Sequence, residues 1–483
     1  MTQNDNNNFY ITTTLPYVNA KPHIGHALEF VQADVIARWQ KLQGKEVIFN
    51  VGTDEHGLKM LQKAQEAGMA VEDFVAMNVQ TFVDFFEQFQ ISYTNFYRTS
   101  LPEHTPVAQG MWERCMTAGD IYKKAYTGLY CVGCESFKTP KDLVDGNCPD
   151  HGVPPVEFAQ ENYFFRLSKY RDQLATYYKE NTILLPENKR QELLNFVENM
   201  EDISISRTKE SLPRWVPVPG DETQVMYVWF DALSNYIGAA GFSHDMDKVA
   251  KFRPGVQIFG PDNLRFQGGI WQGMLASAGF PFTKTLLMHG MVLGTDGNKM
   301  SKTLGNVVDP MEQLAQFGAD AVRYYMIAGM PTFGDTSYKP EDLINMVNSH
   351  LADGFGNLLS RVIALATKKE IKLSDDRTMC SANILAMLTE HENTLITYFN
   401  NYDLYNAANT IHEITMAANK YINDIKPWDK EVDPTVATQC LQDLGIVLYT
   451  LVRYYGVIIP TIADKAKTIL DTMEKGVLFT KVE

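Results

Sequence analysis

A strand, a helix and a second strand follow one another within the first 51 residues of this 483-residue chain. The first strand is predicted at Phe9 to Thr14 and the second at Glu46 to Val51, and between His23 and Gly44 apolar residues recur at the spacing of a helix. A unit of this length predicts a parallel sheet with a right-handed crossover, whose ligand site lies at the carboxyl ends of the strands. The segment at His23 and Asp54 both lie at that edge.

Further along the chain, the pattern predicts an insertion, more strands and a helical region. Between Tyr130 and Phe165, cysteine, glycine, proline and aromatic residues replace the helical period, so we expect a small inserted fold. Strands are predicted again at Val225–Trp229, Val256–Phe259 and Leu286–His289. Past about residue 345, long helical stretches with almost no strand signal predict a helical bundle.

Composition argues against several classes of protein. With 45% hydrophobic residues, the chain is long enough for about three domains and is neither disordered nor fibrous. The 43 basic and 58 acidic residues give a net charge of −15, so a polyanion must bind at a local basic patch. Residues 1–8 show no targeting peptide and no apolar run approaches about 18 residues, so we expect a cytoplasmic protein without a membrane partner.

Four residues have the spacing of a zinc site. Cys131 and Cys134 form a Cys-x-x-Cys pair, and after thirteen residues Cys148 and His151 form a Cys-x-x-His pair. This ligand set predicts one closed, tetrahedral, structural zinc. The alternative is that the three cysteines are reduced core thiols, but the glycine and proline residues around them favour a knuckle. The other cysteines are expected to be ordinary buried thiols: Cys115, Cys380 and Cys440.

Two histidines lie at the predicted turn from the first strand to the helix. His23 and His26 are three positions apart, so they share a helix face and add donors to a helix end that already attracts anions. Gly25 between them lets a flat base approach the backbone. The pair therefore predicts a phosphate site. The alternative is that the histidines only cap the helix, and a His-x-x-His pattern on its own favours that alternative.

A lysine-bearing loop about 275 residues downstream changes this balance. Lys299 and Lys302 are three apart in the segment Lys299-Met300-Ser301-Lys302-Thr303, which Gly294 and Gly305 flank. On a glycine-hinged loop, two lysines can close over a polyphosphate and neutralise the charge on a leaving pyrophosphate. Such a loop alone is usually only solvated, but together with the histidine pair it makes a specific pattern.

These two segments resemble the HIGH and KMSKS signatures of class I aminoacyl-tRNA synthetases. The resemblance is closest to the methionyl-tRNA synthetase family and runs from about residue 9 to the C-terminal helices. Three further segments carry it: Thr14-Leu15-Pro16-Tyr17, Gly52-Thr53-Asp54-Glu55-His56-Gly57 and Tyr227-Val228-Trp229-Phe230-Asp231-Ala232.

The resemblance implies an α/β fold, in which a Rossmann-like parallel sheet is split by a zinc-knuckle insertion and followed by an α-helical bundle that binds the anticodon. Residues 1–115 are expected to form the first half of the catalytic nucleotide-binding fold, and residues 116–224 the connective insertion with the zinc knuckle. The second half is expected at residues 225–290, the KMSKS loop and stem-contact region at 291–345, and the anticodon-binding domain at 346–483.

The resemblance also implies an ATP-dependent methionine–tRNA ligase. It would activate L-methionine to methionyl-adenylate, release pyrophosphate and transfer the acyl group to a methionine tRNA for initiation and elongation. Mg²⁺ is expected with ATP, and one structural Zn²⁺ in the knuckle. The expected catalytic residues are His23, His26, Lys299 and Lys302, and the expected ATP-binding residues are His23, Gly25, His26, Gly260, Asp262 and Lys302.

Methionine needs a carboxylate for its ammonium group and a polarizable apolar slot for its thioether. The resemblance assigns these roles to Leu15, Tyr17, Asp54, Trp229, Ala232, Tyr236 and Phe266. Each aromatic residue has the alternative of being plain core, and Trp229, expected at the end of a strand, is the best supported of them.

The chain departs from the family at two positions near the expected ATP and methionine sites. The family commonly has Gly-Lys-Asp where this chain has Gly260-Pro261-Asp262, which removes a possible phosphate contact. It commonly has histidine where this chain has Gln267, and glutamine cannot be protonated as histidine can. We do not predict a functional role for Pro261 or Gln267.

In the helical region, Asn357 and Arg361 are four residues apart and Trp428 follows Pro427. Such a pair is usually a solvated helix face, but an amide, a guanidinium and an indole can bind unstacked bases. The resemblance implies that these residues recognise the CAU anticodon of a methionine tRNA. Many relatives add a C-terminal module that dimerises; because this chain ends soon after the bundle, we expect a monomer.

Two classes of alternative remain. A leucine, isoleucine or valine synthetase is disfavoured because those enzymes carry a much larger editing insertion than the roughly 110 residues available here, and a cysteine synthetase because it uses a zinc thiolate site for its substrate. Tyr17, Asp54 and Trp229 also favour methionine. A catalytically idle, zinc-containing RNA-binding protein is the alternative from a different class. Methionine-dependent exchange of pyrophosphate into ATP would separate it from a ligase.

Overall fold

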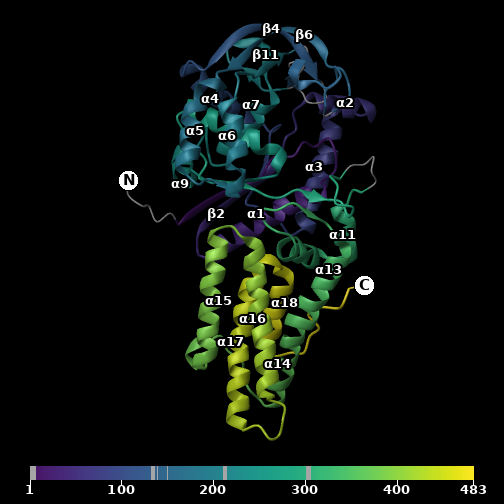
Figure 1. Cartoon of the computed structure of the whole chain (residues 1–483), viewed down its shortest axis with the longest axis vertical. Coiled ribbons are helices and arrows are strands. Elements are labelled where there is room, and N and C mark those ends of the chain that lie inside the picture. Colours follow the sequence, from purple (N-terminus) through teal and green to yellow (C-terminus); the bar gives the residue numbers. More distant parts are fainter. Residues whose placement is uncertain are drawn as a thin grey trace. The chain divides into compact units, whose positions relative to one another are not determined.

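The computed structural model describes residues 7–131, 136–138, 140–149, 151–209, 215–300 and 306–482 (Figure 1). The chain forms two compact units, each assembled from separate stretches of sequence. Unit 1 consists of Met1–Pro22, Lys45–Asp84 and Tyr93–Met288. Unit 2 consists of His23–Gly44, Phe85–Ser92 and His289–Glu483.

Unit 1 contains a six-stranded parallel sheet with the order β3-β2-β1-β12-β13-β7. Its strands are β1 (Asn8–Thr12), β2 (Glu46–Thr53), β3 (Asn95–Arg98), β7 (Leu184–Leu185), β12 (Val256–Phe259) and β13 (Thr285–Met288). The strand order reverses between β1 and β12, which are neighbours, and in open α/β sheets such a reversal is the usual place for a ligand. β1, β2, β12 and β13 confirm predicted strands to within two residues.

The prediction of a strand at Val225–Trp229 was wrong. β11 (Asp221–Met226) ends before Trp229, and it pairs antiparallel with β9 (Ser206–Thr208) and β10 (Pro217–Val218) instead of joining the parallel sheet. Trp229 lies in the short helix α7 (Val228–Leu233). A short apolar run is compatible with a buried strand or a buried helix, and periodicity alone does not separate the two.

A second sheet of unit 1 confirms the predicted insertion between the halves of the parallel sheet. It is antiparallel with the order β5-β4-β6-β8. Its strands are β4 (Ile121–Cys131), β5 (Ser136–Lys138), β6 (Val156–Phe165) and β8 (Ile203–Ser204). Figure 1 shows β4 and β6 beside β11 and the helices α4 to α7 grouped below them.

The helices of unit 1 are mostly short. They are α2 (Leu58–Glu66), α4 (His104–Thr117), α5 (Arg171–Glu180), α6 (Arg190–Glu198), α7, α8 (Asn235–Gly238), α9 (Met246–Phe252) and α10 (Trp271–Ser277). α3 (Val71–Gln88) contributes to both units. A π-helical turn, Phe266–Ile270, leads directly into α10.

Unit 2 is mainly helical, as predicted. Besides α1 (Ile24–Leu42) and the two short strands β14 (Val292–Leu293) and β15 (Thr336–Ser337), it contains α11 (Pro310–Phe317), α12 (Ala319–Tyr324), α13 (Pro340–Met346), α14 (Asn357–Lys368), α15 (Ala382–Asn400), α16 (Leu404–Ile425), α17 (Pro434–Ile458) and α18 (Pro460–Thr472). Figure 1 shows α14 to α18 side by side. Within the described residues, α17 is long and apolar enough to cross a membrane, but 67% of its most apolar window is buried, as in a core helix.

Helix α1, which has His23 at its N-cap, packs against this bundle inside unit 2. The Trp39 ring stacks on the Phe399 ring at 4.2 Å. Asp34 accepts a hydrogen bond from Arg323 at 2.6 Å, and Arg323 also donates to the carbonyl of Ile458 on α17 at 2.7 Å. Asp34 and Arg323 are both fully buried, so each charge depends on the other for compensation.

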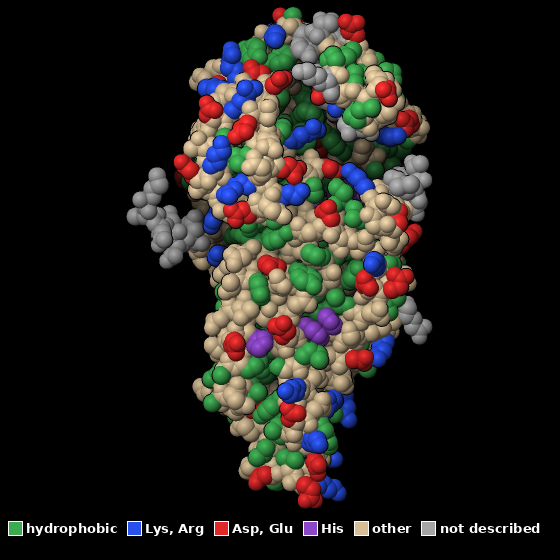
Figure 2. Space-filling model, viewed as in Figure 1, with side chains coloured by type: hydrophobic (Ala, Val, Ile, Leu, Met, Phe, Trp, Pro, Cys, Tyr) green, Lys and Arg blue, Asp and Glu red, His purple; other side chains and the backbone are tan. Residues whose placement is uncertain are grey.

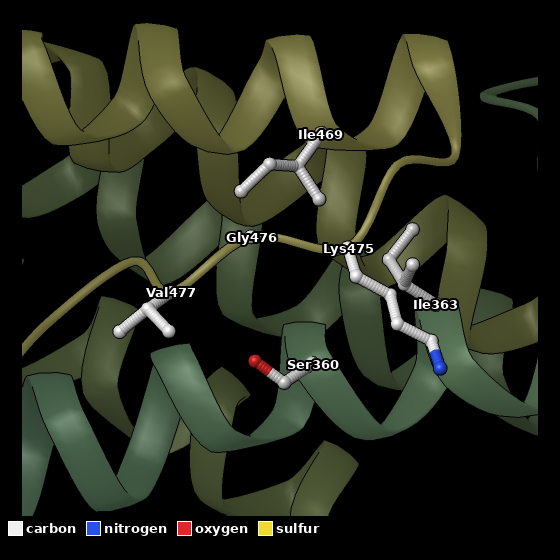
Figure 3. Close-up of a pocket in the computed structure, with 6 residues that line it drawn as sticks. All are labelled: Ser360, Ile363, Ile469, Lys475, Gly476 and Val477. Atoms are coloured by element: carbon white, nitrogen blue, oxygen red, sulfur yellow. The ribbon is translucent and has the colours of Figure 1, made fainter.

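A small pocket of 240 Å³ also lies in unit 2 (Figure 3). It is lined by Ser360, Ile363, Ile469, Lys475, Gly476 and Val477, none of which is a predicted site residue. Figure 3 shows Ile469 on one side of the extended segment that follows α18, and Ser360 and Ile363 of α14 on the other side.

Candidate functional site

The carboxyl ends of β1 and β2 bring the first predicted methionine-binding residues together. Tyr17 and Asp54 form an isolated parallel bridge, in which the Asp54 N–H donates to the carbonyl of Pro16 at 3.0 Å. The carboxylate of Asp54 is buried and accepts a hydrogen bond from the backbone N–H of His56 at 3.2 Å. Leu15 packs against the main apolar core of unit 1. The sheet edge therefore presents one carboxylate beside an apolar surface.

Several aromatic side chains pack on the same apolar core. The Trp229 ring meets the rings of Phe266 and Tyr227 edge to face, at 4.8 and 5.1 Å. Tyr236 is 3% exposed and packs edge to face on Trp271 at 5.6 Å. Trp229 and Phe266 remain partly exposed, so their faces are available to a ligand. Ala232 lies one helical turn after Trp229 on α7.

On the helix that carries Trp229, a buried carboxylate lies between two imidazoles. Asp231 on α7 pairs with Nδ1 of His56 at 2.5 Å and with Nε2 of His104. Burial alone would raise the pKa of Asp231, but His56 and His104 outweigh it and lower that pKa to about 2. Burial lowers the pKa of His56, but Asp231 outweighs it and the net pKa is raised. The pair fixes the helix of Trp229 against the loop that carries Asp54.

The loop after β12 contains the predicted ribose-binding residues. Gly260 ends the strand and its carbonyl accepts from the N–H of Asn263 at 2.9 Å. Pro261 opens the 3₁₀ turn Pro261–Asn263, and Asp262 in that turn is exposed. Because β12 is the neighbour of β1, Gly260 and Asp262 follow a strand end next to the one that Leu15 and Tyr17 follow. Proline thus has a structural role here: its fixed φ suits the first position of the turn.

In unit 2, His23 and His26 cap α1 and also present ligand donors. The N–H of His26 donates to Nδ1 of His23, and the N–H of His23 donates to Nδ1 of His26, both at 3.2 Å. The rings stack at 3.6 Å. Because both Nδ1 atoms accept, the neutral rings carry their protons on Nε2. Burial lowers the pKa of both histidines, that of His26 well below its usual value, so both are neutral donors at neutral pH.

Gly25 leaves room for this ring packing. A Cβ at Gly25 would lie 3.1 Å from two atoms of the His23 ring, closer than a carbon normally approaches. The predicted reason for the glycine was the approach of a base to the backbone; the structure adds a steric reason within the protein itself.

The predicted lysine loop begins ten residues after the buried His289 of unit 2. His289 contacts the carboxylate of Glu29 on α1 at 3.3 Å, and both side chains are at most 6% exposed. From there the chain passes through β14 to Lys299, which is exposed and whose backbone bridges Leu293. Residues 301–305, including Lys302, lie outside the described residues.

Three of the four predicted zinc ligands lie together. Nδ1 of His151 is 3.9 Å from Sγ of Cys131 and 3.8 Å from Sγ of Cys148, and all three ligand atoms lie within 4.8 Å of one another. Tetrahedral zinc with ordinary bond lengths separates sulfur and nitrogen ligands by about 3.6 Å and two sulfur ligands by about 3.8 Å. The group therefore fits a zinc ion. Cys134, the fourth predicted ligand, lies outside the described residues.

Comparisons with known proteins agree with this geometry. The model of the family "tRNA synthetases class I (M)" matches residues 9–155 and 151–363. The methionine–tRNA ligase of Caldanaerobacter subterraneus is 38% identical over 93% of this chain and 71% of its own length, and that of Brucella suis is 36% identical over 96% and 91%. The chain belongs to the methionyl-tRNA synthetase family of class I.

A solved synthetase of the family has the same fold. The Mycobacterium tuberculosis methionyl-tRNA synthetase in complex with methionyl-adenylate superposes with a TM-score of 0.87 at 32% identity, covering 96% of this chain and 93% of that one. A structure of that enzyme in its free state gives a TM-score of 0.82. The α/β fold, the insertion and the helical C-terminal region are therefore those of a methionyl-tRNA synthetase.

In the helical bundle of our chain, two of the three predicted anticodon residues lie together. The guanidinium of Arg361 lies 5.1 Å from the Trp428 ring and donates to the side-chain carbonyl of Asn423 at 2.7 Å. Trp428 is 46% exposed, which is unusual for an indole and leaves much of its ring accessible. Asn357 is exposed at the start of α14, one turn before Arg361.

Sequence reasoning missed several of these residues. His56 and Asp231 belong to segments that carry the family resemblance, so the motifs themselves could have drawn attention to them. His104, Glu29 and Asn423 had no local signal, because they become partners only through contacts between distant segments. Figure 2 shows basic and acidic side chains interspersed over the face it presents, in agreement with a net charge of −15.

Proposed function

We propose that this synthetase activates L-methionine with ATP and charges methionine tRNA. The observation that carries the proposal is the buried carboxylate of Asp54, bridged to Tyr17 at the strand-order reversal, in the same unit as the partly exposed pair Trp229 and Phe266. A carboxylate binds the ammonium group, and aromatic faces with an apolar floor suit a polarizable thioether. The family match and the adenylate-bound relative support this choice of substrate.

The chemistry is in-line attack of the methionine carboxylate on the α-phosphate of ATP. His23 and His26 donate from Nε2 to phosphate oxygens as neutral groups, and Lys299 and Lys302 stabilise the charge on the departing pyrophosphate. Gly260 and Asp262 bind the ribose. Mg²⁺, when bound with ATP, screens the polyphosphate charge. No covalent intermediate with the protein is needed.

One zinc ion, bound by Cys131, Cys134, Cys148 and His151, holds the knuckle of the insertion. With four protein ligands such a site is closed, so the metal has a structural role only. We propose that the protein acts in the cytoplasm.

Transfer to tRNA needs a path for its single-stranded 3′ end. A groove of 870 Å³ in unit 1 is lined by Trp229 together with basic side chains, among them Lys124, Arg171, Arg207 and Arg265. Arg207 lies 4.1 Å from the Tyr227 ring, which also lines the groove. Cations combined with aromatic faces bind single-stranded RNA, and at the other end of the tRNA Asn357, Arg361 and Trp428 bind the CAU anticodon.

The deciding experiment is methionine-dependent exchange of pyrophosphate into ATP, followed by aminoacylation of methionine tRNA. The unaltered protein should catalyse exchange with methionine and not with leucine or valine. Lys302→Ala should lower the exchange rate by roughly three orders of magnitude, as loss of one group that stabilises developing charge does, with little change in methionine affinity. An unaltered protein that binds tRNA but shows no exchange would overturn the proposal in favour of an RNA-binding protein.

A further inference from the structure

Arg265 connects the aromatic pair of the proposed methionine site to the basic groove of unit 1. Its guanidinium carbon lies 4.8 Å from the centre of the Phe266 ring and 5.9 Å from the centre of the Trp229 ring. Those two rings are themselves in edge-to-face contact at 4.8 Å. Arg265 and Trp229 also both line the groove of 870 Å³ that we assign to the 3′ end of the tRNA. The guanidinium therefore lies where a ligand of the groove would meet a ligand of the aromatic pair.

The guanidinium of Arg265 has N–H groups to offer to an anion. The side chain is exposed, and no carboxylate in the described part of the chain pairs with it. Attraction to the two rings holds the planar group in place, while its five N–H donors lie in its own plane. A guanidinium held in this way binds a phosphate through two parallel hydrogen bonds. A phosphate is therefore the ligand that this arrangement favours.

The other two arginines of the groove already bind the protein itself. Nη1 of Arg207 donates to the Ser204 hydroxyl at 2.9 Å and to the Ser206 carbonyl at 2.7 Å. Nε of Arg171 donates to a backbone carbonyl. Arg265 makes no such bond to a described residue, so it is the groove arginine with the most donors left for RNA.

Transfer of the acyl group requires the end of the tRNA to be held in a fixed position. A hydroxyl oxygen of the terminal ribose forms a bond to the carbonyl carbon of the methionyl group, and the bond from that carbon to the adenylate phosphate oxygen breaks. AMP leaves with the electron pair, and the hydroxyl proton passes to the phosphate of AMP. The RNA phosphate nearest to the reacting hydroxyl is the one that joins the terminal nucleotide to the nucleotide before it. Binding of this last phosphate linkage would fix the position of the terminal ribose.

We propose that Arg265 binds the last phosphate linkage of methionine tRNA and thereby positions the terminal ribose for acyl transfer. Methionine and ATP react with each other without the RNA, so activation does not need this contact. The inference deepens the proposed function and rests on it, because a transfer step exists only in a protein that first makes the adenylate.

Arg265→Gln tests this role, because glutamine is polar but carries no charge. Methionyl-adenylate already formed on the protein is mixed with methionine tRNA below saturation, and the rate of a single transfer is measured. We expect that rate to fall about 10-fold to 100-fold, the size of hydrogen bonds to a charged group, while ATP–pyrophosphate exchange falls by at most about threefold. Arg265→Lys is the matched control: it keeps the charge but not the two parallel hydrogen bonds, so it should recover part of the rate.

A change in the RNA tests whether the contact is to the last phosphate linkage. A methylphosphonate in that linkage is uncharged, and it should slow transfer by the unaltered protein about as much as Arg265→Gln does. The two changes together should slow transfer no further, because they remove the same contact. A methylphosphonate in an earlier linkage is the control, and its effect should add to that of Arg265→Gln.

Three results would overturn the role of Arg265 while exchange by the unaltered protein stays normal. They are an unchanged transfer rate in Arg265→Gln, additive effects of Arg265→Gln and the methylphosphonate in the last linkage, and equal losses in transfer and exchange. The third result would assign Arg265 to the activation step instead. Absence of exchange in the unaltered protein would overturn the proposed function itself.

Discussion

Asp231 illustrates how much a single buried charge contributes to the stability of the folded protein. Its carboxylate is fully buried between His56 and His104, and an amide in its place has only one acceptor oxygen, so one of the two imidazoles loses its acceptor. We expect Asp231→Asn to lower the free energy of unfolding by about 3 kcal/mol, as breaking a buried ion pair does.

The pH dependence of this loss follows from the direction of the two pKa shifts. The pKa of His56 is raised above 6.5, so its contribution is complete below that pH and is lost as the pH rises through the raised value. The pKa of Asp231 is lowered from 3.8 to about 2, so its contribution is present above 3.8 and is lost as the pH falls toward 2. Thermal unfolding midpoints of the two proteins should differ most between pH 4 and 6.5 and differ less at higher pH, where only the Asp231 contribution remains. A difference that is constant across this range would contradict the assignment.

The double role of His23 calls for paired substitutions. His23→Ala removes both the acceptor for the His26 N–H and the Nε2 donor, whereas His23→Asn keeps a side chain that accepts at a helix N-cap. We expect both variants to lose exchange activity by roughly 100-fold or more, since both lose the phosphate donor. Only the alanine variant should also lose about 1 kcal/mol of stability. Thermal unfolding and exchange kinetics measured on the same preparations separate the two roles.

Which residues the sequence predicted depends on how far each one acts. His23, His26 and Asp54 were predictable because strand ends and a helix start place them, and local pattern predicts both. Whether Gly25 serves a base or the His23 ring was not predictable, because that depends on side-chain stacking. His104 and Glu29 had no signal, since they gain their partners only through contacts between distant segments.

At the scale of elements, the predicted zinc knuckle has little apolar core of its own. Few buried apolar residues lie between Cys131 and Val156 among those described, so we expect metal ligation to supply the stability that a core would. We expect one zinc per chain in the purified protein, and its loss in Cys148→Ala. Cys380→Ala is the matched control. Cys380 lies in the bundle, so this variant should keep its zinc. Metal analysis of the three proteins checks this, and a zinc-free unaltered protein would contradict it.

Trp428 gives the element-scale test of the bundle. Its exposed ring beside Arg361 offers a stacking surface, and one base stacked on an aromatic ring contributes about 1–3 kcal/mol. Trp428→Ala should therefore lower aminoacylation by about 10-fold to 100-fold while exchange stays within about twofold. Val436→Ala is the control, because Val436 is 47% exposed on α17 and is not a predicted anticodon residue. Equal losses in both assays would contradict the anticodon role.

Element types were predictable where the pattern is long or strictly periodic. α1 and α17 show helical spacing over many residues, and β12 is a short apolar run that ends in glycine. Val225–Trp229 failed because six consecutive apolar residues, from Val225 to Phe230, continue across the end of β11 into α7. β7 has only two residues, and nothing in Leu184–Leu185 indicates the edge of a sheet.

At the scale of the whole molecule, net charge makes a statement about tRNA binding. A chain with 15 excess negative charges that binds RNA has to do so through a limited number of cations. We expect a shallow salt dependence of tRNA affinity, corresponding to only a few phosphate contacts, when binding is measured between 50 and 200 mM salt. A slope corresponding to ten or more contacts would indicate an extensive basic surface instead.

The fastening of α1 to the helical bundle has a consequence for how such an enzyme can be rearranged. α1 carries His23 and His26, yet its Trp39 stacks on Phe399, and its Asp34 pairs with an arginine that also binds the Ile458 carbonyl. The bundle therefore cannot be exchanged without losing contacts that hold α1 in unit 2. Exchanging residues 346–483 for the bundle of another synthetase would replace the contacts that hold α1, so the exchange activity of such a chimaera should depend on how the new bundle packs against α1.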